Sequence, residues 1–199
     1  MDEPSDITWN ESLENVIAKE GERCSGYAWL HSESEKHYSQ RSNLIAIPVI
    51  VLSTLAGSAN MALGGVGDAK ITSISVGAIS ILTGILSTIG SYFAWAKRAE
   101  THRICAIQYQ KLSRYLTIEM SLPAKERMKA SDLLKTTREQ IERLLEISPI
   151  IPNEVILKYK ERFKDYTDIA HPENTNGLMK IEVNRSVSLS TPKIGIVIK

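Results

Sequence analysis

Two consecutive stretches of the sequence carry no charged side chain, and they constrain the fold more than any other feature. Residues 42–67 and 71–96 are 26 residues long each, and only residues 68–70 separate them. A helix needs about 20 mostly apolar residues to cross the hydrocarbon layer of a bilayer. The sequence therefore predicts a transmembrane hairpin, with spans at about 44–64 and 71–96.

The alternative is a pair of helices buried inside a soluble domain. A chain of 199 residues has too little other apolar surface to cover two such helices on every side. We therefore predict an all-α membrane protein, in which a two-helix transmembrane hairpin joins a cytosolic helical bundle and a short extended, β-like C-terminal tail.

The chain divides into four segments by its hydrophobic pattern. We expect an N-terminal amphipathic helix in 1–41, the hairpin in 42–96, a cytosolic helical region in 97–170 and the extended tail in 171–199. Helix formers continue past the second span to Leu122, so one helix is expected to leave the membrane and run into the cytosol.

Individual residues indicate where the predicted helices begin and end. Pro48 lies near the start of the first span, where the helix can begin or bend. One helix is expected over 124–148, and another from Asn153, as its N-cap, to Tyr166. After a loop at 173–177 the apolar residues alternate, so the tail is expected either to stay disordered or to add a strand to a protein partner.

Basic residues flank the two span ends that adjoin the termini, whereas the connecting turn holds only Lys70, beside Asp68. Because cytosolic flanks are enriched in Lys and Arg, both termini are predicted to be cytosolic. Which membrane is crossed stays open. The predicted interfacial anchors are Arg41, Tyr92, Trp95, Lys97 and Arg98.

Charge and motifs exclude several classes of function. The net charge of +1 is spread over mixed segments, without the basic stripe that nucleic-acid binding needs. The sequence has no phosphate-binding glycine loop and no nucleophile elbow, so we predict no enzyme activity, no catalytic residue and no cofactor. No ionisable residue lies in either span, which argues against a proton-coupled transporter.

The cysteines and histidines outside the spans are not interpreted as a metal or redox site. Cys24 and Cys105 have no metal or redox spacing and are expected to behave as small apolar residues. Four further ligand-type residues lie just outside the membrane ends, where side chains are more often solvated or locally bonded than metal-binding. These four are His31, His37, Glu100 and His102. We predict no metal site.

Small residues form a row along each span. In the second span they step by four, three, four, three and four residues, which places them on one narrow face. The candidate helix-packing or pore-lining residues are Ser53, Gly57, Asn60 and Gly64 in the first span, and Ser73, Gly77, Ser80, Gly84, Ser87 and Ser91 in the second.

Such rows mark contact faces, because helices in lipid associate through close backbone approach. A row can close the hairpin on itself, face other subunits, or line a pore after oligomerisation. Packing is the more general use of small residues, so we favour packing over pore lining and expect a homo-oligomer whose apolar faces meet the lipid bilayer.

Three motifs occur in the order of a known family: IPVIVLSTLAG at 47–57, AETH at 99–102 and ISPIIP at 147–152. In these motifs and in architecture, from about Trp9 to Ala170, the chain resembles the SLATT family. That name denotes two-transmembrane effector domains associated with nucleotide-sensing and nucleotide-making partners in prokaryotic defence systems. The resemblance implies a protein that oligomerises and permeabilises a membrane when a linked sensor is triggered.

The chain departs from the defence-system pattern by carrying the strand-like tail in place of a fused nucleotide-binding or nucleotidyltransferase domain. Stand-alone relatives of the family occur in eukaryotes and in large DNA viruses with internal membranes. Two functions therefore remain open: a pore-forming or permeabilising effector, or a structural membrane anchor, for example a minor virion protein that ties an internal membrane to a shell.

Overall fold

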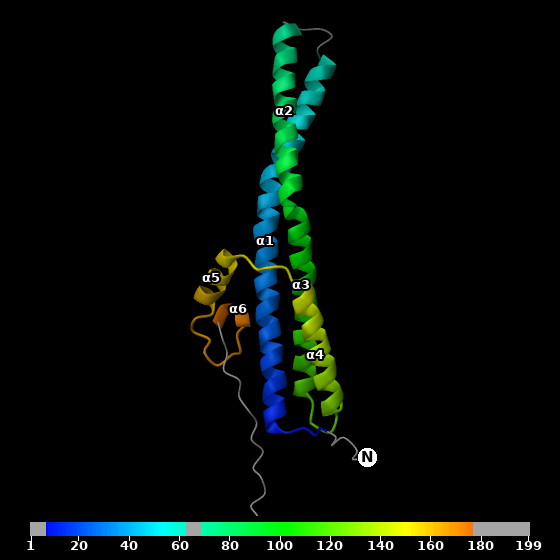
Figure 1. Cartoon of the computed structure of the whole chain (residues 1–199), viewed down its shortest axis with the longest axis vertical. Helices are drawn as coiled ribbons and strands as arrows, with labels where there is room; N and C mark the ends of the chain where they lie inside the picture. Colours follow the sequence, from blue (N-terminus) through cyan, green and yellow to red (C-terminus); the bar gives the residue numbers. More distant parts are fainter. Residues whose placement is uncertain (1–6, 63–68, 177–199) are drawn as a thin grey trace, which may run out of the picture.

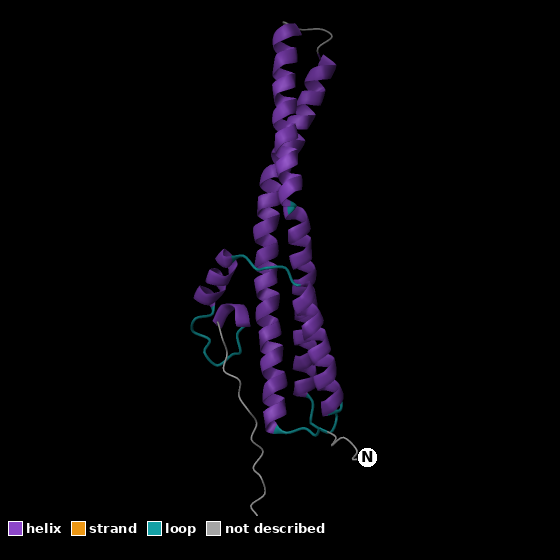
Figure 2. Cartoon of the chain, in the orientation of Figure 1, coloured by secondary structure: helices purple, strands orange, loops and turns teal. Residues whose placement is uncertain are grey.

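The computed structural model describes residues 7–62 and 69–176 (Figure 1). Within these residues every regular element is a helix, and no strand is present (Figure 2). The helices are α1 (Glu11–Ala62), α2 (Ala69–Phe93), α3 (Trp95–Ser121), α4 (Ala130–Ile147), α5 (Asn153–Arg162) and α6 (Glu173–Asn176). The all-α prediction is confirmed for this part of the chain, whereas the alternating segment of the predicted tail lies outside it.

α1 is one continuous helix of 52 residues. Its first part is polar and amphipathic, and from Ser42 onward it carries no charge. At Pro48 the helix was expected either to begin or to bend. Pro48 lies inside α1, so the helix does not begin there. The predicted first span is therefore a direct extension of the polar helical segment that precedes it.

α2 and α3 follow each other with a single break at Ala94. This residue has φ 49° and ψ 38°, in the left-handed region that favours glycine. The hydrogen bonds from Ala94 N to Gly90 O (3.1 Å) and from Arg98 N to Ala94 O (3.0 Å) continue across the break. The prediction of one uninterrupted helix to Leu122 is therefore wrong, although α3 does run on in nearly the same direction (Figure 1).

The molecule is a long rod built on an antiparallel pair (Figure 1). The uncharged part of α1 packs on α2, and the polar part packs on α3. The hydrophobic core lies between α1 and α3, where Ile17, Leu30, Tyr109 and Leu116 are each at most 1% exposed. α4 packs on α3, α5 packs on α1, and the short α6 packs on α5.

The helix predicted at 124–148 begins later, at Ala130. Residues 124–127 form turns and a bend, which the Arg127 side chain holds against the end of α3. Its guanidinium donates hydrogen bonds to the carbonyl oxygens of Leu122 (2.7 Å) and Met120 (3.3 Å). It also binds the Glu14 carboxylate at 2.7 Å, so the turn is tied to α1 as well.

Two further boundaries differ from the sequence prediction. Asn153 is the first residue of α5, not its N-cap; Pro152 occupies the cap position, and no side chain caps this end. α5 ends at Arg162 rather than near Tyr166, because residues 163–165 form a turn. The loop predicted at 173–177 contains the single turn of α6.

Candidate functional site

α2 packs on α1 through a line of residues spaced by three and four. Val76 on this line is 8% exposed, and Ile79, Thr83, Leu86 and Gly90 are half-buried. We call these five residues the contact line. The residues of α1 that meet it are Ala56, which is buried, and Ile45, Val49 and Leu52, which are half-buried.

The predicted small-residue row of α2 is separate from the contact line. Its members Gly77, Ser80, Gly84, Ser87 and Ser91 each follow a contact-line residue by one position and are exposed, as is Ser73. One residue corresponds to about 100° around a helix, so the row faces sideways from the hairpin. A methyl group added at Gly77 or Gly84 would meet nothing within 4 Å. Within the part of the chain that is described, the row does not close the hairpin on itself.

The first span shows the same offset. Ser53 and Gly57 are exposed and follow Leu52 and Ala56 by one position, and a methyl group at Gly57 would also meet nothing within 4 Å. Because the two helices are antiparallel, a one-residue offset in the same sense places both rows on the same side of the pair. The side chain of Asn60, and Gly64 altogether, lie outside the described residues.

Among the described residues, the same side of the molecule stays uncovered along the α1–α3 part of the rod. Two shallow hollows lie between α1 and α3, and about half of the side chains that line them are small. Most of these small residues again stand one position after a buried residue, such as Cys24 or Cys105. The small and polar lining residues are Ala18, Gly21, Ser25, Ala28 and Ser32 from α1, and Ala106, Gln110, Ser113, Thr117 and Ser121 from α3. A third hollow lies at the base of the hairpin and includes Ala46, Ser87 and Ser91. We call this continuous side, from Ser121 up to Ser73, the open face.

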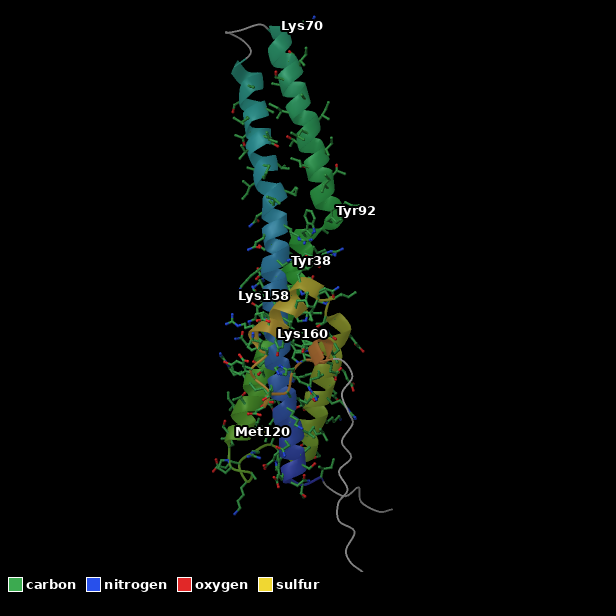
Figure 3. All side chains as sticks on the ribbon, turned by 90° about the vertical axis from the view of Figure 1, so that its left-hand side faces the viewer. Tyr38, Lys70, Tyr92, Met120, Lys158 and Lys160 are labelled. Atoms are coloured by element: carbon green, nitrogen blue, oxygen red, sulfur yellow. The ribbon has the colours of Figure 1, made fainter. Side chains whose placement is uncertain are left out.

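The opposite side of the α1–α3 pair is covered. Gly26, which precedes Tyr27 of the core, lies against Pro172 and Tyr159. Glu33 binds Lys158 of α5, which Figure 3 shows beside α1. In the part of the chain that is described, one side of this pair is therefore covered, and the open face is a long surface that no other helix covers.

The predicted interfacial anchors gather around the Ala94 break. Tyr92 is 82% exposed at the lower end of α2, far from Lys70 at the other end (Figure 3). Trp95 stacks on Phe93 at 4.9 Å between ring centroids. Lys97 is exposed. The two remaining anchors contact other helices: Arg98 lies 5.9 Å from the Tyr38 ring centroid of α1, and Arg41 lies 3.6 Å from the Glu154 carboxylate of α5.

A buried pair of histidines lies below the anchors, and it was not predicted from the sequence. His31 and His102, expected to be solvated or locally bonded, are each 1% exposed, and their Nδ1 atoms lie 2.9 Å apart. His37 and Glu100 do not join them: His37 lies 3.4 Å from Glu154, and Glu100 binds Arg103. No cluster of three metal-ligating side chains occurs in residues 7–62 and 69–176.

Comparison of the chain with protein-family models, with curated proteins and with solved structures gave no match.

Proposed function

We propose that this protein is a small integral membrane protein whose α2 and upper α1 cross a bilayer, with both termini in the cytosol. The support is the exposure of large apolar side chains on both helices, among them Leu44 (74%), Ile74 (65%) and Ile81 (67%). In the most apolar 18-residue windows of the two helical stretches, 0% and 6% of residues are buried. A soluble protein seldom leaves a surface of this kind in water.

The dimensions of α2 agree with a span. Its 25 residues extend about 37 Å at 1.5 Å per residue, which exceeds the roughly 30 Å of a hydrocarbon layer. Lys70 lies at one end and Lys97 follows the other, so both ammonium groups can reach a headgroup region. The side chains between them carry no charge.

We further propose that copies of the chain associate through the open face. The observation that carries this proposal is the one-residue offset between the contact line and the small-residue rows: one face holds the hairpin together, and a second face of small residues is left exposed. In lipid, apolar side chains gain nothing by meeting each other, whereas small residues permit close helix approach. The assembled hairpins would permeabilise the membrane, as the SLATT resemblance suggests.

Ion flux through liposomes that hold the purified chain tests this function. Gly77→Leu and Gly84→Leu add bulk to the open face without a clash inside the chain, and we expect them to reduce flux and cross-linked oligomer at least tenfold. Ala78→Leu is the matched control. Ala78 is exposed, but it stands one position before the contact-line residue Ile79, on the side of α2 away from the small-residue row. Tight vesicles at oligomer-forming densities would favour the membrane-anchor function instead, and equal losses in all three variants would contradict association through the open face.

A further inference from the structure

Two buried imidazoles join α1 to α3 directly below the hairpin. Nδ1 of His31 and Nδ1 of His102 are 2.9 Å apart, a hydrogen-bond distance. In such a bond one ring must donate an N–H and the other must present a bare nitrogen, so the contact exists only while at least one imidazole is neutral. The link between the two helices therefore depends on protonation.

The surroundings of His31 indicate which ring donates. Its Nε2 is buried and has no hydrogen-bond partner among the described residues. A buried N–H without an acceptor is less tolerable than a bare nitrogen, so the single proton of His31 belongs on Nδ1. His31 thus donates to His102, and His102 carries its own proton on Nε2.

Aromatic rings enclose the pair on both sides. Tyr109 of α3 stacks on His31 at 5.5 Å, and Tyr38 of α1 stacks on His102 at 5.4 Å. Tyr27 continues the column by stacking on Tyr109 at 5.1 Å. These neutral rings replace the water that would solvate an imidazolium.

Charged groups on the surrounding helices are engaged elsewhere. The Glu33 carboxylate of α1 binds Lys36 and Lys158, Glu100 of α3 binds Arg103, and Glu154 of α5 faces His37 and Arg41. The guanidinium of Arg98 lies 5.9 Å from the Tyr38 ring centroid, so the charge that contacts this ring is positive. Cys24 and Cys105 add only neutral thiols to this interface, because burial raises the pKa of both.

Burial and the neighbouring imidazole together lower the pKa of His31 to about 4, and burial lowers the pKa of His102 to about 4. While the hydrogen bond is kept, a first proton can be added only at Nε2 of His31, where it becomes a buried N–H without an acceptor among the described residues. A second proton must take Nδ1 of His102, and two N–H groups then face each other in place of the hydrogen bond.

We propose that the His31–His102 pair is an acid-sensitive latch that holds α1 and α3 together at neutral pH and releases them when both imidazoles are protonated. Because α1 is continuous, release at this layer changes the spacing of the helices that lead into the hairpin. The latch is a property of the cytosolic bundle and does not depend on the membrane function proposed above.

Thiol labelling of the full-length chain tests the latch. Cys24 and Cys105 lie in the same α1–α3 interface and are 2% and 1% exposed, so they report its opening. A reagent that remains reactive in acid is used, and each rate is divided by that of the denatured chain at the same pH. If the open state has ordinary histidine pKa values, the opening constant rises roughly 500-fold between pH 7 and pH 5 for two protons, and roughly 20-fold for one.

The His31→Gln, His102→Gln double variant should lose this rise, whereas His37→Gln should keep it, because His37 lies outside the pair. If the double variant does not fold, imidazole nitrogen NMR of the wild-type chain decides: the latch predicts two histidines that titrate below pH 5. A labelling ratio that stays constant from pH 7 to pH 5, a rise retained in the double variant, or four histidines with ordinary pKa values would overturn the proposal.

Discussion

Gly90 and Ile45 bring α2 and α1 into close approach at the base of the hairpin. A methyl group at position 90 would lie 3.4 Å from Cγ2 of Ile45, so it would already touch α1, and a larger side chain has no room there. At Gly77 the same methyl group would meet nothing within 4 Å. Two glycines on one helix therefore have different surroundings, because one lies on the contact line and the other on the open face.

This difference predicts opposite outcomes for two similar substitutions. Gly90→Leu should push α2 away from α1 and lower the stability of the hairpin by about 1–3 kcal/mol, as overpacking does. Gly77→Leu should leave the stability of the isolated chain almost unchanged. Thermal unfolding at a protein concentration too low for association measures both, and equal effects would contradict the assigned contact line.

A second glycine, Gly26, fixes the position of the segment around α6. A methyl group there would lie 2.6 Å from Cδ of Pro172 and 2.9 Å from the Tyr159 hydroxyl oxygen. We expect Gly26→Ala to loosen α5 and α6 from α1, at a cost of about 1–3 kcal/mol. Faster hydrogen exchange of the α5 amides would show this. Gly21→Ala is the control, since its methyl group would make an ordinary contact of 3.5 Å with Leu116.

The histidine pair predicts how the stability of the bundle changes with pH. The folded-state pKa values of His31 and His102, about 4, lie below the ordinary 6.5, so the unfolded chain binds protons first as the pH falls. Stability should be complete above pH 6.5 and fall between pH 6.5 and pH 4, by at most about 1.4 kcal/mol per pH unit for each group.

Denaturant unfolding at pH 7, 6 and 5 measures this dependence. The carboxylate of Glu33, whose pKa its lysine partners Lys158 and Lys36 lower, loses its contribution only below its ordinary pKa of 4.5, so it does not affect this range. If the denaturant concentration at the midpoint of unfolding rises as the pH falls from 7 to 5, the histidine pair is not a buried neutral pair.

The left-handed residue at the α2–α3 break gives a fourth prediction. Ala94 has φ 49°, which strains a residue with a Cβ by roughly 1 kcal/mol. Ala94→Gly should relieve this strain and raise the unfolding temperature, whereas Ala94→Val should lower it. Differential scanning calorimetry of the two variants tests the sign, and stabilisation by valine would show that the break is not strained.

Run length and periodicity were sufficient to predict the helical architecture of the described residues and their two long apolar helices. They were not sufficient for the break at Ala94, because alanine is a strong helix former and its conformation is set by the junction around it. Pro48 shows the reverse: proline normally ends or bends a helix, yet α1 continues through it.

The candidate site, too, could be predicted from the sequence only in part. The small-residue rows are visible in the sequence, but which side they face depends on their offset from the contact line, and that offset needs the pairing of α1 with α2. His31 and His102 were misjudged because residues next to the membrane ends were expected to be solvated, whereas both side chains are buried between α1 and α3. Their spacing held the missing signal, since His31 continues the inward repeat of Cys24 and Tyr27, and His102 that of Cys105 and Tyr109.

The account depends most on lipid surrounding α2 and the upper part of α1. Spin labels introduced one at a time at Ile74, Ile81 and Tyr92, in the chain reconstituted in bilayers, test this directly through their collision rates with oxygen and with a water-soluble nickel complex. We predict that the ratio of oxygen to nickel collisions is highest at Ile81, in the middle of α2, and falls toward both ends. Higher nickel than oxygen accessibility at Ile81 would contradict the account.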